Sequence, residues 1–246
     1  LDKVNALREH PECKVAFCSG YKRPAEYPLL NQYISEFGDP FSFFVYRFSK
    51  GVPFFEKVMK KRFEIKDDEK NYTVLKKPII CELCCMGTMI DRVYFEKFKG
   101  AFTDGAIFTH LFYYMIGQGD DAVAFMKNDP LVHYSVDIFK AYLAKLKWRI
   151  INNVHFSDQA ENGFSGREKF QPKVKVRKLL FPLYSISIIF PVLDSINLSI
   201  TRKNPVYLLH WALCLYVVFQ IVYQYVLKIF GKTPRMKSYD GKKIIR

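Results

Sequence analysis

Two groups of cysteines are the residues whose type and spacing first suggest metal chemistry. CELCC at residues 81–85 contains a C-x-x-C pair, and Cys13 and Cys18 are separated by four residues. A structural zinc site needs two ligand pairs of matching spacing, and the second pair here does not have it. We therefore expect no metal ligands in this chain and predict reduced, half-buried cysteines on a strand. Reduced thiols are typical of proteins in the cytosol.

Trp148 and Arg149 form an aromatic–basic pair that suits a sugar and a phosphate. An indole ring can cover one face of a sugar, and a guanidinium group offers planar, bidentate donors to a diphosphate. The alternative is an aromatic residue at a membrane interface beside a basic side chain that extends toward the headgroups. The sequence leaves both interpretations open.

Apolar strands alternate with amphipathic helices through the first part of the chain. Strand-like segments are KVAFCSG (14–20), PIICELCCMGTMI (78–90) and AVAFM (122–126). Helix-like segments are LDKVNALREHPE (1–12), GAIFTHLFYYMIG (105–117) and SVDIFKAYLAKLKWRIINN (135–153). The aromatic window at 41–48 is either core or an amphipathic piece on a lipid surface. This alternation predicts an α/β fold.

Two long apolar runs follow, at 179–201 and 206–230. The second contains only Lys228 as a formal charge, and at about 1.5 Å per residue it is long enough to cross a bilayer core of roughly 30 Å. The first contains Asp194, Pro182 and Pro191, which would also suit a re-entrant or interfacial helix. With RKNP (202–205) as a short turn, the two runs predict a transmembrane helical hairpin.

The basic excess of the chain is concentrated around these runs. Residues 1–166 contain 23 Lys/Arg and 21 Asp/Glu, whereas residues 167–246 contain 15 and 3. This distribution favours anionic membrane headgroups as a partner and argues against nucleic acid. Basic residues flank both ends of the hairpin, so the positive-inside rule places both ends, and the main domain, in the cytoplasm.

Several motifs in this order resemble the C-terminal half of a family 2 glycosyltransferase of the membrane-bound branch, which has a GT-A fold. The motifs are GTMIDRVYFEKFKGAFTD (87–104), a helix that ends at Gly119, NDPLVH (128–133) and KLKWR (145–149). The resemblance implies transfer of a sugar from a nucleotide-sugar donor to a lipid-linked or glycan acceptor, at a bacterial plasma membrane. It also implies that the donor-binding half and its Mg²⁺ or Mn²⁺ lie upstream of residue 1, so that the chain alone is inactive and binds no metal.

The same resemblance assigns site residues. Asp104 is the implied general base, which must lie within hydrogen-bond reach of the acceptor hydroxyl. The implied substrate-binding residues are Gly87, Asp91, His133, Trp148, Arg149 and Arg167, of which Arg167 is expected to face a lipid phosphate.

The sequence also departs from the family pattern. Ile107 and Phe108 occupy the place of the usual Glu-Asp pair, and Ala144 and Lys147 replace the Gln and Arg of the Q-x-x-R-W motif of processive synthases. The alternative function is therefore a non-catalytic, membrane-anchored binding protein with a degenerate transferase fold. Asp104 is, on that alternative, a loop residue or a helix cap.

The predicted organisation has four parts. Residues 1–166 form a partial GT-A-like domain on the acceptor side, and 167–178 form a basic juxtamembrane segment. Residues 179–230 form the transmembrane hairpin, and 231–246 form a basic cytoplasmic tail.

Overall fold

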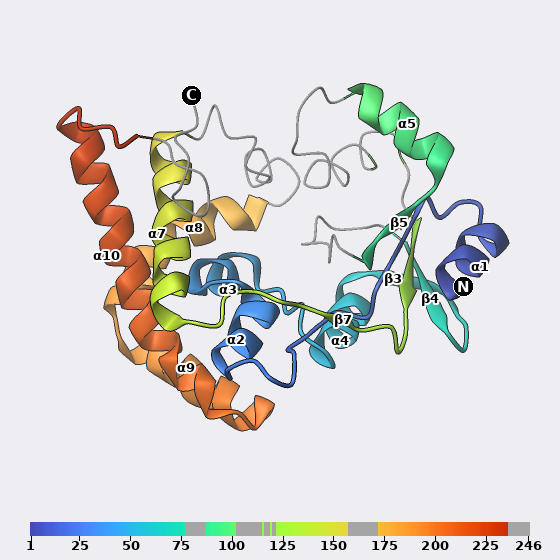
Figure 1. The fold of residues 1–246 in the computed structure, drawn as a ribbon, viewed down its shortest axis with the longest axis horizontal. Helices are drawn as coiled ribbons and strands as arrows, with labels where there is room; N and C mark the ends of the chain where they lie inside the picture. The colour runs from blue at the N-terminus through green and yellow to red at the C-terminus, as the bar shows by residue number, and fades with distance from the viewer. Residues whose placement is uncertain (77–86, 102–114, 116–118, 120–121, 157–171, 236–246) are drawn as a thin grey trace. The chain divides into compact units, whose positions relative to one another are not determined.

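The computed structural model describes residues 1–76, 87–101, 115, 119, 122–156 and 172–235 (Figure 1). These residues form a mixed α/β structure, as predicted. They fall into two compact units that interleave in sequence. The first contains the described residues of Leu1–Pro24, Phe48–His133 and Gly166–Pro172. The second contains those of Ala25–Arg47, Tyr134–Ser165 and Lys173–Arg246.

A mixed five-stranded sheet with the order β3-β4-β6-β1-β5 organises the first unit. Its strands are β1 (Val15–Phe17), β3 (Glu64–Asp68), β4 (Tyr72–Lys76), β5 (Met89–Ile90) and β6 (Ala122–Met126). β1 runs parallel to β6, while the β1–β5, β3–β4 and β4–β6 pairs are antiparallel. The short strands β2 (Tyr21–Lys22) and β7 (Leu131–Val132) form a separate parallel pair. The helices of this unit are α1 (Asp2–Glu9), α4 (Phe54–Arg62) and α5 (Arg92–Ala101).

The core of the first unit lies against the two central strands. All residues of β1 and β6 are buried, as expected for strands that are covered on both faces. Phe17, Phe55 and Phe125 pack with ring centroids 5.5–6.1 Å apart, so α4 is fixed to the sheet by an aromatic cluster. Cys13 and Cys18 are buried thiols, and burial raises the pKa of Cys13 to about 12. Such a thiol is unreactive at neutral pH.

The β3–β4 hairpin is an addition to the predicted strands. EIKDD carries one apolar residue in five and is largely exposed, so its sequence reads as a polar segment. It forms an edge strand because it pairs with the buried strand β4. The connection between the two strands is short, since β3 continues to Asp68 and β4 begins at Tyr72. The CELCC segment and the helix expected at 105–117 lie outside the described residues, apart from Met115.

Asp68 makes the stability of the first unit depend on pH. It pairs with Lys127 at 2.8 Å and accepts a hydrogen bond from the Thr73 hydroxyl at 2.6 Å, and these contacts lower the pKa of Asp68 to about 2 from an ordinary value of 3.8. A carboxylate with a lowered pKa stabilises the fold above its unfolded pKa, and this stabilisation is lost as the pH falls through the folded value. We predict that Asp68→Asn flattens the loss of thermal stability between about pH 4 and pH 2. An unfolding midpoint that falls as steeply in the variant as in the parent would contradict this.

The second unit is helical. It contains α2 (Leu30–Phe37), α3 (Pro40–Tyr46), α7 (Phe139–His155), α8 (Pro172–Ile186), α9 (Ile189–Arg202), the 3₁₀ helix η3 (Pro205–Leu209) and α10 (His210–Ile229). One hydrophobic core joins these helices, with Tyr33, Tyr142, Phe181 and Tyr207 among its fully buried side chains. The aromatic window at 41–48 supplies α3 and packs into this core, since Phe41 and Phe44 contact Phe181. The core interpretation of that window is confirmed.

The segment Pro205–Ile229 is long and apolar enough to span a membrane. The preceding apolar run is different, because α8 and α9 meet at a bend of 93° near Ser187 and Ile188. Ile188 has a positive φ of 58°, which ends the helical path at that point. The run at 179–201 is thus a bent pair of helices, which together are long and apolar enough for one broken span or a re-entrant segment.

The division into units also differs from the single domain predicted over residues 1–166. Residues 25–47 and the helix α7 belong to the second unit because their apolar side chains pack with α8, α9 and α10 in one core. Sequence order therefore conceals the association of these segments with the apolar C-terminal helices.

Candidate functional site

In the first unit, the carboxyl end of β1 brings together one predicted site residue and a buried serine. The β1–β5 register, with Val15 opposite Ile90, places Gly87 beside Cys18. A Cβ on Gly87 would lie 3.1 Å from the Cβ of Cys18, so a larger residue at this position would require the Cys18 side chain to shift by a few tenths of an ångström. Ser19 follows, and its buried hydroxyl has no hydrogen-bond partner within the described part of the chain. In open α/β sheets ligands bind at the carboxyl ends of parallel strands, so this edge is a candidate for substrate contact.

His133 lies just after β7, at the end of the segment that follows β6. Its ring stacks on Tyr21 with centroids 4.4 Å apart and an interplanar angle of 18°. Its backbone N–H donates to the carbonyl of Lys22 at 2.8 Å. The structure thus anchors His133 to β2, with its half-buried ring stacked against Tyr21.

Asp91 lies at the other end of β1 from Gly87. Its backbone N–H donates to the Lys14 carbonyl at 2.9 Å, and its carboxylate accepts from the Tyr94 N–H at 2.8 Å. Asp91 is therefore the N-cap of α5, and the structure does not bring it together with Gly87 or His133. The predicted site residues Asp104 and Arg167 lie outside the described residues.

Gly20 is required for the turn that follows β1. It has φ +123°, and an added Cβ would lie 2.6 Å from the Lys50 carbonyl oxygen and 3.0 Å from the Phe55 Cβ. We predict that Gly20→Ala destabilises the protein by about 3 kcal/mol, because strain and a backbone clash act together. The control is Gly119→Ala, which also has a positive φ but no neighbour within 4 Å among the described residues. In urea unfolding, Gly119→Ala should lose clearly less free energy of unfolding than Gly20→Ala. Equal losses in the two variants would show that the backbone clash at Gly20 does not contribute.

The second unit holds a cavity of 670 Å³ that brings Trp148 and Arg149 together. The polar or charged residues that line it are Asp39, Ser42, Arg149, Asn152, Asn153 and Lys178. The rest of its wall is apolar or aromatic and comes from α3, α7, α8 and α10, including Phe41, Leu146, Ile150, Phe181, Val217 and Ile221. A mostly apolar cavity with a few convergent polar groups is the usual form of a small-molecule site.

Arg149 is held at the cavity by Asp39. Its guanidinium lies 3.0 Å from the Asp39 carboxylate, and Asp39 also caps α3 by accepting from the Ser42 N–H at 2.6 Å. The Tyr142 hydroxyl donates to the Gly38 carbonyl at 3.0 Å, which fixes the backbone next to Asp39. Complete burial raises the pKa of Tyr142 well above its usual value, so this phenol is always a hydrogen-bond donor here.

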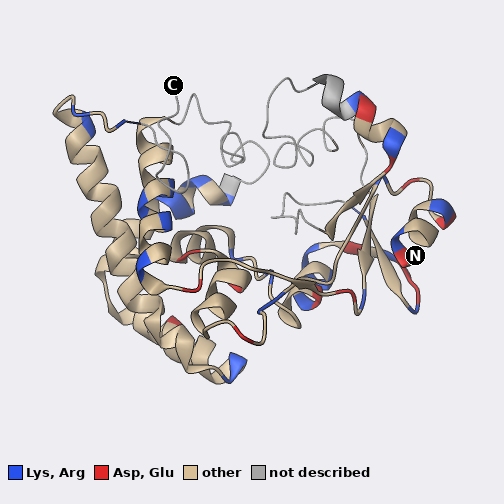
Figure 2. Cartoon of the chain, viewed as in Figure 1, with Lys and Arg blue, Asp and Glu red and all other residues tan. Residues whose placement is uncertain are grey.

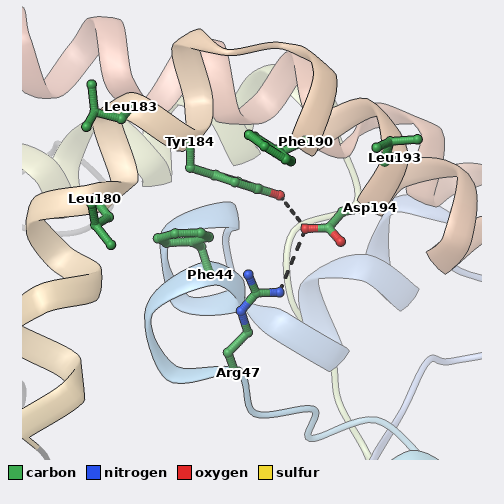
Figure 3. Close-up of a pocket in the computed structure, with 8 residues that line it drawn as sticks. All are labelled: Phe44, Arg47, Leu180, Leu183, Tyr184, Phe190, Leu193 and Asp194. Carbon is green, nitrogen blue, oxygen red and sulfur yellow. Dashed lines mark hydrogen bonds and ion pairs between the residues drawn. The ribbon is translucent and has the colours of Figure 1, made fainter.

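A second, more open hollow of 490 Å³ lies where α8 bends into α9 (Figure 3). The Tyr184 hydroxyl donates to Asp194 at 2.7 Å, and the Arg47 guanidinium lies 3.8 Å from the same carboxylate. The Arg47 guanidinium also lies 5.0 Å from the centre of the Phe44 ring. The apolar side chains around this group are Leu180, Leu183, Phe190 and Leu193. Asp194, the charged residue that interrupts the first apolar run, is thus paired with Arg47 and Tyr184 within the protein.

Sequence reasoning missed Asp39, Lys178 and Arg47. For Asp39 a signal existed, because an Asp followed by Pro at the start of an apolar segment is typical of a helix N-cap. Lys178 belongs to the basic segment that was interpreted only as a membrane flank. For Arg47 no local signal exists, since its partner Asp194 lies far along the chain.

Within the described ranges, no group of three or more His, Cys, Asp or Glu could hold a metal ion. Comparisons with known protein families, curated proteins and solved structures give no match for this chain. The functional assignment therefore depends on the geometry of the two candidate regions.

Proposed function

We propose that the chain belongs to a membrane-associated glycosyltransferase that transfers a sugar from a nucleotide-sugar to a lipid-linked acceptor. The observation that carries the proposal is the cavity of the second unit. Two cations, Arg149 and Lys178, and the indole of Trp148 line it together with apolar side chains of four helices. A polyprenyl phosphate has both parts that this lining suits, a phosphate and a hydrocarbon chain.

Charged and apolar side chains of the cavity lining support such an amphiphile as the ligand. A guanidinium can hold two phosphate oxygens at once, and its contact with Asp39 keeps it in place before the ligand arrives. The apolar wall formed by Phe181, Val217 and Ile221 can cover the first carbon atoms of the lipid chain. Trp148 would cover the sugar face next to the phosphate.

The first unit supports the chemical step. The carboxyl edge of β1 and β6, with Gly87, Ser19 and His133 near it, is the place where an α/β sheet binds a substrate. Asp104 is the proposed base that accepts the proton of a P–OH group on the acceptor phosphate, whose oxygen then attacks the sugar. The bond from the sugar to the nucleoside diphosphate breaks as the bond to the acceptor oxygen forms. The leaving nucleoside diphosphate carries negative charge that a divalent ion, if bound, would neutralise.

The proposed location is the cytoplasmic face of a bacterial plasma membrane. The apolar segment Pro205–Ile229 and the basic residues that begin α8 support an attachment to anionic lipid. Basic residues near such a surface contribute about 1 kcal/mol each. Attachment would confine the active site to the plane that contains the acceptor.

The test is sugar transfer by the full-length gene product in membranes, with a panel of nucleotide-sugars, Mg²⁺ or Mn²⁺, and polyprenyl phosphate. We expect one donor to be used and Asp104→Asn to abolish transfer. If the Asp104→Asn variant still transfers sugar, the protein is a glycosyltransferase but Asp104 is not its general base. No transfer from any donor by folded, membrane-bound protein would contradict the enzyme and favour the non-catalytic, membrane-anchored binding protein.

A further inference from the structure

Helix α10 has one packed face and one exposed apolar face. The buried residues of the packed face are His210, Leu213, Cys214, Val217, Val218 and Gln224. The exposed face carries Trp211, Phe219, Val222, Val226 and Ile229, each at least 40% exposed and on one side of a helix of 3.6 residues per turn. The helix is thus two-sided, with protein on one side and an uncovered apolar stripe on the other.

Helix α7 lies alongside α10 and runs in the same direction (Figure 1). The Tyr216 hydroxyl donates to the Leu143 carbonyl at 3.1 Å, and the Lys228 ammonium donates to the Val154 carbonyl at 2.6 Å. Near the C-terminal end of α7, His155 and Gln224 are also hydrogen-bonded, at 3.1 Å. From Leu143 to Val154 the two helices therefore stay together over about 16 Å, roughly half of a bilayer core.

This pairing determines which membrane arrangement the unit can adopt. α7 carries Lys140, Lys145, Lys147 and Arg149, visible as basic segments beside the apolar α10 (Figure 2). If α10 crossed the bilayer, α7 would enter the hydrocarbon with it and bring these charges along. Charged side chains at that depth are costly. A position in the plane of the interface keeps α7 on the water side.

The turn between α9 and α10 is also held on the protein side. Arg202 donates to the fully buried Glu36 of α2 through Nε at 3.1 Å and Nη2 at 2.8 Å. The Tyr207 hydroxyl donates to the other oxygen of the same carboxylate. In a hairpin of two spans this turn would lie across the membrane from the beginning of α8. The turn is instead bound to α2. This agrees with helices that lie in the plane of the membrane surface.

The bent pair α8–α9 completes the surface. Its exposed apolar residues include Leu179, Leu183, Ile186, Ile189, Phe190 and Leu193, on both sides of the 93° bend. The N-terminal part of α8 is basic, with Lys173, Lys175, Arg177 and Lys178, and Figure 2 shows this basic stretch. α8 is tied to α3 because Arg177 donates to the Val45 carbonyl at 3.2 Å. Apolar side chains bordered by basic ones are the pattern of interfacial helices on anionic lipid.

We infer that α8, α9 and α10 lie in the plane of one leaflet of an anionic bilayer, with their exposed apolar side chains inserted and none of them crossing it. The second unit is thus a monotopic membrane-binding module. This inference shares the membrane partner with the proposed function but does not depend on sugar transfer.

The test measures the depth of three tryptophans along α10. The chain has two tryptophans, so Trp148→Phe leaves Trp211 alone, and Trp148→Phe/Trp211→Phe receives either Phe219→Trp or Ile229→Trp. The two new tryptophans occupy exposed positions and should not disturb the fold, which circular dichroism checks. Each whole-chain variant is added to equimolar phosphatidylglycerol–phosphatidylcholine vesicles with bromine near the headgroup or near the end of the acyl chain.

An in-plane helix places the three tryptophans at one shallow depth, so the ratio of shallow to deep quenching should agree within about twofold. In a spanning helix these positions would cover about 27 Å, and position 219 would be quenched several-fold more by the deep label than 211 and 229. That quenching profile would overturn the in-plane arrangement, although the protein would still bind the membrane. Absence of vesicle binding, or dimers that form through the same face instead, overturns both.

Discussion

Glu36→Gln is expected to lower the free energy of unfolding by about 3 kcal/mol, because it leaves the Arg202 guanidinium without its buried counter-ion. Glu36 is completely buried and Arg202 side-chain exposure is 17%, so solvent cannot replace the lost partner. The same change removes the charge that accepts from Tyr207. At 2–4 °C per kcal/mol for a chain of this size, thermal unfolding in detergent should fall by roughly 6–12 °C.

The matched control is Glu56→Gln on α4, which removes a carboxylate from an exposed pair with Lys60 at 3.0 Å. An exposed pair of this kind contributes little, and we expect less than about 0.5 kcal/mol. The double variant Glu36→Gln/Arg202→Met should recover part of the loss, because it no longer buries an unpaired cation. A Glu36 variant as stable as the Glu56 variant would show that the turn after α9 is not held by this pair.

Arg149→Gln is expected to weaken the binding of polyprenyl phosphate by roughly ten- to hundred-fold, the usual value of a hydrogen bond to a charged group. The Gln side chain can still reach Asp39 but has no charge and no planar fork of donors. Arg149→Lys should lose an intermediate amount, because it keeps the charge without the bidentate geometry. Titration of the purified protein in detergent, with tryptophan fluorescence as the signal, measures this effect.

Lys147→Gln is the control for the change of charge. Lys147 is exposed on the same helix and does not line the cavity, so its removal should change the affinity less than twofold. Equal losses in the two variants would mean that only the overall charge of α7 matters. The cavity would then not be the binding site.

The local elements were largely predictable because each has its own pattern. KVAFCSG and AVAFM form the central strands β1 and β6, and the spacing of apolar residues around Tyr142 and Leu146 gives α7. The length and apolar character of the last run correctly indicated a helix at α10. In each case the signal lies within one short segment.

Contacts between distant segments were not predictable from one sequence. Glu36 in LNQYISEF has the appearance of a surface residue, and its burial depends on Arg202 and Tyr207. The cavity requires α3, α7, α8 and α10 to meet. The sequence places Trp148 beside Arg149, but only the fold adds Asp39 and Lys178. A hydropathy pattern likewise shows that α10 is apolar, but it does not show that one face of α10 packs against α7 while the other face stays exposed.

The most direct test of the central claim is to locate a polyprenyl phosphate that carries a photoactivatable group in its first isoprene unit. After irradiation in membranes, we expect the labelled peptides to come from the cavity wall on α7, around 146–154, and on α8, around 178–182. Arg149→Gln should remove this labelling and Lys147→Gln should keep it. Labelling confined to the exposed face of α10, and unchanged in Arg149→Gln, would contradict a lipid-phosphate site in the cavity.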